Sequence, residues 1–386
     1  MEPQEKISNK VTLDNKHWNI PHQDMVSEIV PTEHVIFIGS SFNVFKFKPS
    51  SNLKLYFVDV DREKYLSNLL CHFDNDTETY SAIIISEEIG ITNLSILLDV
   101  IGSNGNIEQT PVLLCCGEHN RCLELCKNYS QIDDVVSIQK FTSEELARKI
   151  QFLRKIKSIK NRKSRCSSVP PTIHPILYKI DYIIRRFLDI IIASIVTFIL
   201  SPLFLIISIV IRFESKGPIF YAAYRAGRDY RIFKFFKFRS MVYNADSQLE
   251  SLKFDNQYHA SSPGGPMFFK VANDPRITKF GSFLRKTSLD ELPQLINVLK
   301  GEMSLVGNRP LPLYEAATLT RDDCAERFLA PAGITGLWQI EKRGRSEMSA
   351  SERIGLDIRY AHNNSVWSDL KIILKTPFSM RQKEKV

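Results

Sequence analysis

The feature that most constrains this chain is one long apolar run at residues 187–211, FLDIIIASIVTFILSPLFLIISIVI. The run is 25 residues long, and its only ionisable side chain, Asp189, lies near its start. About 20 apolar residues in a helix are enough to cross the hydrocarbon core of a bilayer. The sequence therefore predicts a helix that enters a membrane here. We expect Asp189 to pair with Arg185 or Arg186 at helical spacing.

Two features of this run bear on whether it spans the bilayer. Ser201 and Pro202 lie in its middle, where a proline removes a backbone hydrogen bond and bends a helix. Positive residues flank both ends, whereas a spanning helix carries its positive charge mainly on the cytosolic side. Both observations favour a re-entrant helix that enters from the cytosolic face, breaks at Ser201 and Pro202 and returns. A kinked spanning helix stays open as the alternative.

Residues 31–150 carry the pattern of an α/β domain. Five β-branched runs, HVIFIG, KLYFVDV, AIIIS, PVLLCC and VVSI, alternate with helical stretches such as SEELARKIQFLRKI. This alternation is typical of a doubly wound parallel sheet. The domain resembles a response-regulator receiver, but Ser86 stands where that family carries its phospho-accepting aspartate. We therefore expect a receiver-like docking or regulatory module without the Mg²⁺ and phosphate chemistry of a receiver.

The net charge of +8, from 51 Lys and Arg against 43 Asp and Glu, indicates an anionic partner. A basic stretch at residues 151–176 ends in Ser and Pro just before the apolar run, which favours a linker near lipid headgroups over a nucleic-acid site. The seven cysteines are odd in number and lack paired CxxC spacings, so we expect reduced thiols and no zinc site. The N-terminal residues contain no apolar run and predict no secretory signal peptide.

After the apolar run, basic and aromatic residues alternate through residues 217–241, and an acidic pair, Asp290 and Glu291, follows. Arg276, Arg285 and Lys286 supply positive charge nearby in the sequence. Guanidinium groups bind phosphate oxygens in pairs. A carboxylate beside such cations can attack phosphorus while a second carboxylate holds Mg²⁺. The pattern therefore predicts a phosphate site at a membrane surface.

A structural role for the same acids stays open. The sequence SLDE at residues 288–291 matches a capping box, in which Glu291 would only satisfy a backbone N–H. With Ser288 as N-cap, Pro293 would be the fifth helical residue and would break a hydrogen bond, whereas with Asp290 as N-cap it falls in the tolerated first turn. In either case both acids would lie at the positive end of a helix dipole, which favours ionised carboxylates.

From about residue 182 to the C-terminus the chain resembles the bacterial sugar transferases, the monotopic phosphoglycosyl transferases. The ordered matches are RRFLD at 185–189, SP at 201–202, GP at 217–218, KFRSM at 237–241, RKTSLDELPQ at 285–294, MSLVG at 303–307, RP at 309–310 and PAGITGLWQ at 331–339. One position departs from the family: many members have proline where this chain has Asn308, which leaves the neighbouring Arg309 in place.

This resemblance implies a re-entrant membrane helix and a mainly α catalytic domain with interfacial amphipathic helices, on the cytosolic face of the bacterial inner membrane. It implies that Asp290 attacks the β-phosphate of a UDP-sugar, releases UMP and holds a covalent phosphosugar, which then passes to undecaprenyl or another polyprenyl phosphate. Glu291 would bind the required Mg²⁺. The residues expected to bind substrate are Arg239, Arg276, Arg285, Lys286 and Arg309. Such a reaction is the first membrane step in making a surface polysaccharide or glycoconjugate.

The predicted organisation is a leader (1–30), a receiver-like domain (31–150), a basic linker (151–176), the re-entrant helix (177–214) and the catalytic domain (215–386). The expected partners are a UDP-sugar, polyprenyl phosphate and membrane lipid, and a homo-oligomer or a regulatory partner of the N-terminal domain is left open. Two other functions are also open. One is a non-catalytic, membrane-tethered signalling protein, against which the missing phospho-acceptor argues. The other is a one-step phosphotransferase or hydrolase that uses Asp290 as a base.

Overall fold

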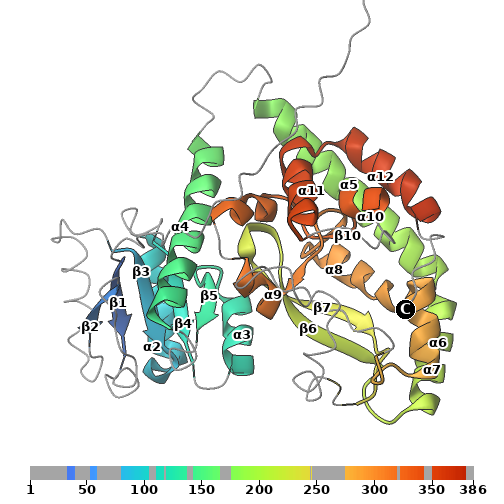
Figure 1. Ribbon diagram of the computed structural model, residues 1–386, viewed down its shortest axis with the longest axis horizontal. Coiled ribbons are helices and arrows are strands. Elements are labelled where there is room, and N and C mark those ends of the chain that lie inside the picture. Colours follow the sequence, from blue (N-terminus) through green and yellow to red (C-terminus); the bar gives the residue numbers. More distant parts are fainter. Residues whose placement is uncertain are drawn as a thin grey trace, which may run out of the picture.

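The computed structural model describes residues 33–39, 53–58, 80–103, 110–116, 119–136, 142–165, 175–243, 245, 274–319, 322–342 and 350–379. In Figure 1 an N-terminal sheet with its helices lies beside a larger, mostly helical C-terminal region. The predicted α/β class, with a parallel sheet followed by a mainly helical part, is confirmed at this level.

The N-terminal sheet has five parallel strands in the order β2-β1-β3-β4-β5. The strands are β1 (Glu33–Ile38), β2 (Leu53–Val58), β3 (Ala82–Ser86), β4 (Val112–Cys115) and β5 (Asp134–Val136). The helical elements are η2 (Glu87–Ile89), α2 (Ile91–Ser103), α3 (His119–Asn128) and α4 (Ser143–Arg165). All five predicted runs form strands, because continuous β-branched runs suit strands that are buried on both faces. Any likeness to a receiver beyond this parallel sheet stays a prediction.

Helix α4 begins where the sequence predicts a helix and continues without a break to Arg165. Its start is a capping box: the backbone N–H of Glu145 donates to Thr142 Oγ1 at 3.2 Å, and that of Thr142 donates to Glu145 Oε2 at 2.9 Å. The helix therefore crosses the expected domain end at residue 150 and occupies much of the stretch assigned to a linker. The domain boundaries stay predictions.

The apolar run forms two helices, α5 (Pro175–Ile199) and α6 (Ser201–Glu214). Their axes meet at 60°, and the pair together has the length and apolar composition of a membrane segment, whereas no single helix in the described part of the chain does. Pro202 lies in the first turn of α6, where its missing N–H costs nothing, and Ser201 Oγ donates to the carbonyl of Phe198 at 2.8 Å. The predicted break is thus confirmed as a bend, and its place in a membrane stays a prediction.

The C-terminal region contains two small sheets among short helices. Strands β6 (Phe220–Ala226) and β7 (Ile232–Phe238) form an antiparallel hairpin, and the sheet order is β7-β6-β9. The other strands are β8 (Ser304–Val306), β9 (Leu311–Pro312) and β10 (Gly333–Thr335), with β8 and β10 parallel. The helical elements are η5 (Arg228–Tyr230), α7 (Lys279–Thr287), η8 (Leu289–Glu291), α8 (Gln294–Lys300), α9 (Leu313–Thr318), η9 (Asp322–Leu329), α10 (Leu337–Lys342), α11 (Ala350–Asn363) and α12 (Val366–Ser379).

One hydrophobic core joins the two regions. Phe152 on α4 lies edge-to-face against Tyr230 at the tip of the β6–β7 hairpin and against Phe328 on η9, with ring centroids 5.3 and 5.8 Å away. These residues belong to a cluster that also includes side chains of β1, β3 and β4. Helix α3 adds an ion pair between Lys127 and Glu302 at 3.5 Å. The N-terminal sheet is therefore packed onto the hairpin side of the C-terminal region, as Figure 1 shows.

Candidate active site

The predicted acidic pair lies at the end of strand β7. Lys237, the penultimate residue of β7, places its Nζ 3.1 Å from Asp290 Oδ2 and 2.9 Å from Glu291 Oε1. Asp290 is buried, Glu291 is partly exposed, and the Lys237 side chain is 21% exposed. One ammonium group thus bridges two neighbouring carboxylates at the surface of the fold. A buried carboxylate needs such a partner, because an isolated buried charge is strongly disfavoured.

The local backbone explains why both acids face the same cation. Helix α7 ends at Ser288, which adopts a left-handed conformation with φ of 57°, and the acids follow in the 3₁₀ turn η8. Helix α8 begins only after Pro293, and no side chain caps either η8 or α8. Both capping alternatives predicted for Ser288 and Asp290 are therefore wrong. A left-handed turn costs a non-glycine residue free energy, and such turns recur where side chains must be aimed precisely.

Arg285 on α7 is the guanidinium group that the structure brings towards the acids. Its Nε donates to Ser240 Oγ at 3.0 Å, just beyond strand β7. Burial lowers the pKa of Arg285, whereas the charges of Asp290 and Asp274 act to raise it. Arg309 also acts to lower it, so these two arginines share one region of positive potential.

Arg309 extends this positive region from Arg285 to Arg353. Its side chain is exposed. Burial lowers the pKa of Arg353, on α11, to about 10, and the next largest cause is the charge of Arg309. Neighbouring cations that lower each other's pKa create a positive electrostatic potential, which favours the binding of an anion. Lys286, another of the predicted substrate ligands, is exposed on the final turn of α7.

Two of the predicted substrate ligands have structural partners instead. Arg239 is buried, and its guanidinium donates to the carbonyls of Ser215 and Lys216, at 2.7 and 3.2 Å, at the end of helix α6. Arg276 is buried in a bidentate pair with Asp274, its Nη2 lying 2.6 Å from Oδ2. A role for these two arginines in binding substrate stays a prediction.

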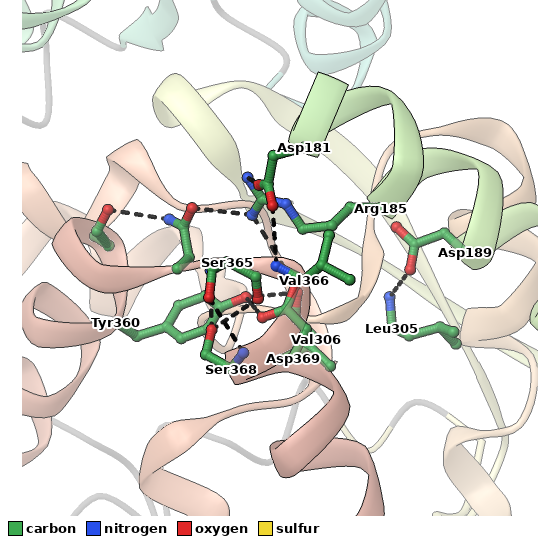
Figure 2. Close-up of polar contacts among 12 residues, drawn as sticks. Asp181, Arg185, Asp189, Leu305, Val306, Tyr360, Ser365, Val366, Ser368 and Asp369 are labelled. Atoms are coloured by element: carbon green, nitrogen blue, oxygen red, sulfur yellow. Dashed lines mark hydrogen bonds and ion pairs between the residues drawn. The ribbon is translucent and has the colours of Figure 1, made fainter. Parts of the chain in front are cut away.

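Helix α5 is anchored next to the site by polar contacts. Figure 2 shows Arg185 and Asp181 on α5 facing the start of α12, and Asp189 facing Leu305. Arg185 pairs with Asp181 at 2.7 Å, and Asp189 Oδ1 accepts from the backbone N–H of Leu305 at 3.0 Å. The charges of Arg186 and Arg185 also act on the Asp189 carboxylate, as the helical spacing predicts, although its hydrogen bond goes to Leu305. Arg186 also donates to the carbonyls of Val298 and Leu299 in α8. These contacts hold the apolar helices at a fixed distance from the acids.

The cysteines depart from the sequence-based expectation. Cys116, after β4, and Cys122, on α3, form a disulfide, so the prediction that all seven cysteines are reduced thiols is wrong for this pair. Glu87 lies beside this pair, and the three side chains could hold a metal ion only after reduction, because the thiolate and not the disulfide is the metal ligand. Cys115, Cys126 and Cys324 are buried thiols outside this disulfide. The disulfide lies in the N-terminal sheet region, away from the acidic pair.

The acidic pair fits a magnesium ion, the cofactor predicted for it. Two carboxylate oxygens, one from Asp290 and one from Glu291, converge on the single ammonium of Lys237. Mg²⁺ characteristically binds one or two protein carboxylates and takes its other oxygens from water and substrate phosphates. The donor set is therefore suitable, and Mg²⁺ binding itself stays a prediction.

Lys237 is the residue that sequence reasoning left unassigned. It was one of several cations in the basic and aromatic block at residues 217–241. Its partners lie 53 and 54 positions further along the chain, and no local spacing links them. Only the packing of β7 against η8 brings them together.

The fold and the site together define a class of protein: a bent apolar helix pair anchored beside a lysine-bridged acidic pair with arginines nearby, suited to phosphate chemistry. Comparison with known families makes this specific. Residues 180–383, more than half of the chain, match the bacterial sugar transferase family, and the chain belongs to that family.

Several curated relatives share this region. The chain is 45% identical to the galactosyl transferase CpsE of Streptococcus agalactiae over 203 residues, 52% of this chain and 42% of that protein. It is 40% identical to the undecaprenyl-phosphate galactose phosphotransferase of Salmonella typhimurium over 193 residues, 50% of this chain and 39% of that protein. It is 36% identical to a UDP-glucose:undecaprenyl-phosphate glucose-1-phosphate transferase of Klebsiella pneumoniae over 230 residues, 57% and 45% of the two chains. The match thus spans less than half of each relative.

Proposed function

We propose that this protein is a phosphoglycosyl transferase that moves a sugar phosphate from a UDP-sugar to undecaprenyl or another polyprenyl phosphate. The observation that carries the proposal is the pairing of Lys237 with Asp290 and Glu291 beside the bent apolar helices. Relatives that match this same region are named for reactions of undecaprenyl phosphate with galactose or glucose phosphate. This transfer would be the first membrane step in the synthesis of a surface polysaccharide or glycoconjugate.

The proposed reaction has two displacements at phosphorus. A carboxylate oxygen of Asp290 bonds to the β-phosphorus of the UDP-sugar, the bond from that phosphorus to the bridging oxygen breaks, and UMP leaves with the electron pair. An oxygen of polyprenyl phosphate then attacks the same phosphorus and releases Asp290 unchanged. The donor, a UDP-sugar, is soluble in water, whereas the acceptor, polyprenyl phosphate, is a lipid. A covalent intermediate lets a single site react with each of them in turn.

The residues divide this work by charge. Lys237 and Arg285 offset the negative charge that would repel an attacking carboxylate from a diphosphate. Arg309 lies further out and suits the nucleotide phosphate, and Lys286, exposed on α7, suits a more distant phosphate contact. Bound at Glu291, Mg²⁺ would supply further neutralisation of the phosphate oxygens.

The membrane placement follows from exposed apolar side chains. Phe198 is 82% exposed at the bend between α5 and α6, and Phe213 is 87% exposed near the end of α6. Such rings on the surface indicate contact with lipid. We propose that α5 and α6 enter and leave the cytosolic face of the inner membrane, which puts the acids at headgroup height. Trp367, exposed on α12 beside Lys371, suits the same interface.

The test compares the wild type with Asp290→Asn in membrane fractions given Mg²⁺, undecaprenyl phosphate and a panel of UDP-sugars. We expect UMP release from one sugar, lost in the variant by about 1,000-fold or more because an amide cannot form the intermediate. Asp229→Asn is the matched control, because this residue lies at the hairpin tip in a left-handed conformation that asparagine also adopts.

The possible results distinguish the role of Asp290, the donor class and the number of displacement steps. Release that survives in Asp290→Asn removes Asp290 as the nucleophile. No release from any sugar by folded, membrane-bound protein contradicts the proposed donor class. A sugar phosphate trapped on the wild-type protein supports two displacements, whereas turnover in which none is ever trapped favours a one-step reaction with Asp290 as base.

A further inference from the structure

Asn297, in the middle of helix α8, is fully buried at 0% exposure and uses its carboxamide completely. Its Oδ1 accepts from the backbone N–H of Phe236 at 3.1 Å. Its Nδ2 donates to the carbonyl of Lys234 at 2.7 Å and to Glu302 Oε2 at 2.6 Å. These partners fix which end of the amide is oxygen, because a carbonyl and a carboxylate only accept.

Two of these hydrogen bonds take the place of the backbone bonds that a neighbouring strand would make to β7. Strand β7 is the edge of its sheet, in the order β7-β6-β9, and β6 bonds to only one side of it. On the side away from β6, Asn297 accepts from residue 236 and donates to residue 234, as the backbone of an additional strand would. A helix side chain therefore fixes the register of β7 against α8.

This register decides where Lys237 points. Lys237 directly follows Phe236, and its ammonium meets Asp290 and Glu291, which directly precede α8. Because side chains alternate along a strand, a shift of one residue in β7 would turn Lys237 to the opposite face. The strand and the helical segment are thus joined twice, once through Asn297 and once through Lys237.

The rotamer of Asn297 is itself held from the N-terminal region. Glu302 accepts from Asn297 through Oε2, and its Oε1 lies 3.5 Å from Lys127 Nζ on α3. On the same helix, Glu124 lies 3.8 Å from Lys234 of β7. The N-terminal region therefore contacts the two groups that flank Asn297.

We propose that Asn297 is a positioning residue: it locks β7 in the register that places Lys237 on the acidic pair, and Glu302 with Lys127 extends this lock to the N-terminal region. The inference deepens the proposed transfer reaction and rests on it for its catalytic consequence. Asn297 touches neither substrate nor the acids, and it acts through Lys237.

The first test follows Lys237 directly and needs no activity. The full-length protein in detergent is treated with N-hydroxysuccinimidyl acetate, and acetylation of each lysine is measured by peptide mass spectrometry. In Asn297→Ala we expect Lys237 to react roughly tenfold faster, because the lost hydrogen bonds free the strand. Lys149, which is buried with Asp134, is the internal reference and should not change. Asn364→Ala, which removes a bond to Arg185 on α5, is the matched control variant.

The second test is kinetic and uses single-turnover UMP release, followed for hours so that slow variants stay measurable. We expect Asn297→Ala to lower the rate roughly 100-fold with little change in the UDP-sugar KM, since a displacement of about 1 Å costs that much. In a Lys237→Gln background the same substitution should have no further effect, whereas independent effects would multiply.

The outcomes separate this inference from the proposed function. Unchanged acetylation of Lys237, an equal rise at Lys149, or multiplicative rates would each overturn the role of Asn297. If Asn297→Ala does not fold, Glu302→Ala removes only one of the bonds, and it should raise Lys237 acetylation in the same direction by a smaller factor. A wild type that releases no UMP contradicts the transfer reaction. The acetylation experiment, which needs no activity, still tests whether Asn297 holds Lys237 on the acidic pair.

Discussion

At the scale of single residues, the site depends on charges compensated by partners from distant segments. Asp290 is buried, and its compensating charges are Lys237 from β7 and Arg285 from α7. Arg239 and Arg276 carry the same kind of charge but are engaged with the end of α6 and with Asp274. Positive charge near an acid in the sequence is thus a poor guide to which cation reaches it.

Asp369 on α12 gives a prediction about pH. Burial raises the pKa of this carboxyl to about 6, although a hydrogen bond from Tyr360 acts to lower it. Because the folded protein binds this proton more tightly than the unfolded chain, the stability that the proton contributes is full below about pH 4 and is lost as the pH rises through 6. Asp369→Asn removes this dependence, so the variant should gain of the order of 2 kcal/mol over the wild type between pH 4 and 7.

The measurement is thermal unfolding of both proteins across this pH range, with the surface substitution Asp99→Asn as the control. A difference between variant and wild type that stays constant with pH would show that folding does not raise the pKa of Asp369. Figure 2 shows the residues concerned, with Tyr360 and Asp369 beside Arg185.

At the scale of elements, close backbone approach sets the geometry of the site. A Cβ added to Gly281, in the first turn of α7, would collide with the backbone carbonyl of Ser240. Ser240 follows β7, and its hydroxyl accepts from Arg285. The glycine therefore lets α7 approach β7 closely enough for Arg285 to lie near the acids.

Gly281→Ala tests this approach. We expect a loss of about 1–3 kcal/mol in the free energy of unfolding, because the colliding atom is backbone and cannot rotate away. Gly355→Ala is the matched control: Gly355 is exposed on α11 and nothing lies within 4 Å of its added Cβ, so the substitution should stabilise by about 0.5–1 kcal/mol. Urea unfolding of the two variants measures both values. Equal effects at the two glycines would contradict a close approach at Gly281.

At the scale of the whole molecule, the N-terminal sheet and the C-terminal region share one core. The aromatic rings of Phe152, Tyr230 and Phe328 meet at centroid distances of 5.2–5.8 Å, and Tyr230 reaches them from a backbone with φ of 58°. The hairpin that carries Lys237 at one end is therefore anchored in the N-terminal region at the other. The N-terminal region is therefore packed against the hairpin that carries Lys237.

Phe152→Ala tests the shared core. Removal of this fully buried ring should cost about 3–5 kcal/mol and reduce hydrogen-exchange protection in β6 as well as in β3, since both strands contribute side chains to the same cluster. Phe57→Ala, at an exposed phenylalanine on β2, should have little effect on either strand. Protection that falls in β3 alone would mean that the two regions are stable independently.

Local patterns determined much of this protein in advance. The five parallel strands, the start of α4 and the bend at Ser201 and Pro202 follow from β-branched runs, a capping box and a proline, which act within a few residues. The acids Asp290 and Glu291 were also identified as a pair, by their spacing and by resemblance to a family. These features depend on neighbours along the chain.

Tertiary structure alone decided which charges meet. Asp189 accepts a hydrogen bond from the backbone N–H of Leu305, the acids lie in a 3₁₀ turn instead of capping a helix, and Lys237 reaches both of them. The disulfide between Cys116 and Cys122 was likewise decided by the tertiary structure. Ionic and covalent pairing depends on distances of a few ångströms between side chains. Those distances are set by the packing of elements far apart in the sequence, which no local pattern records.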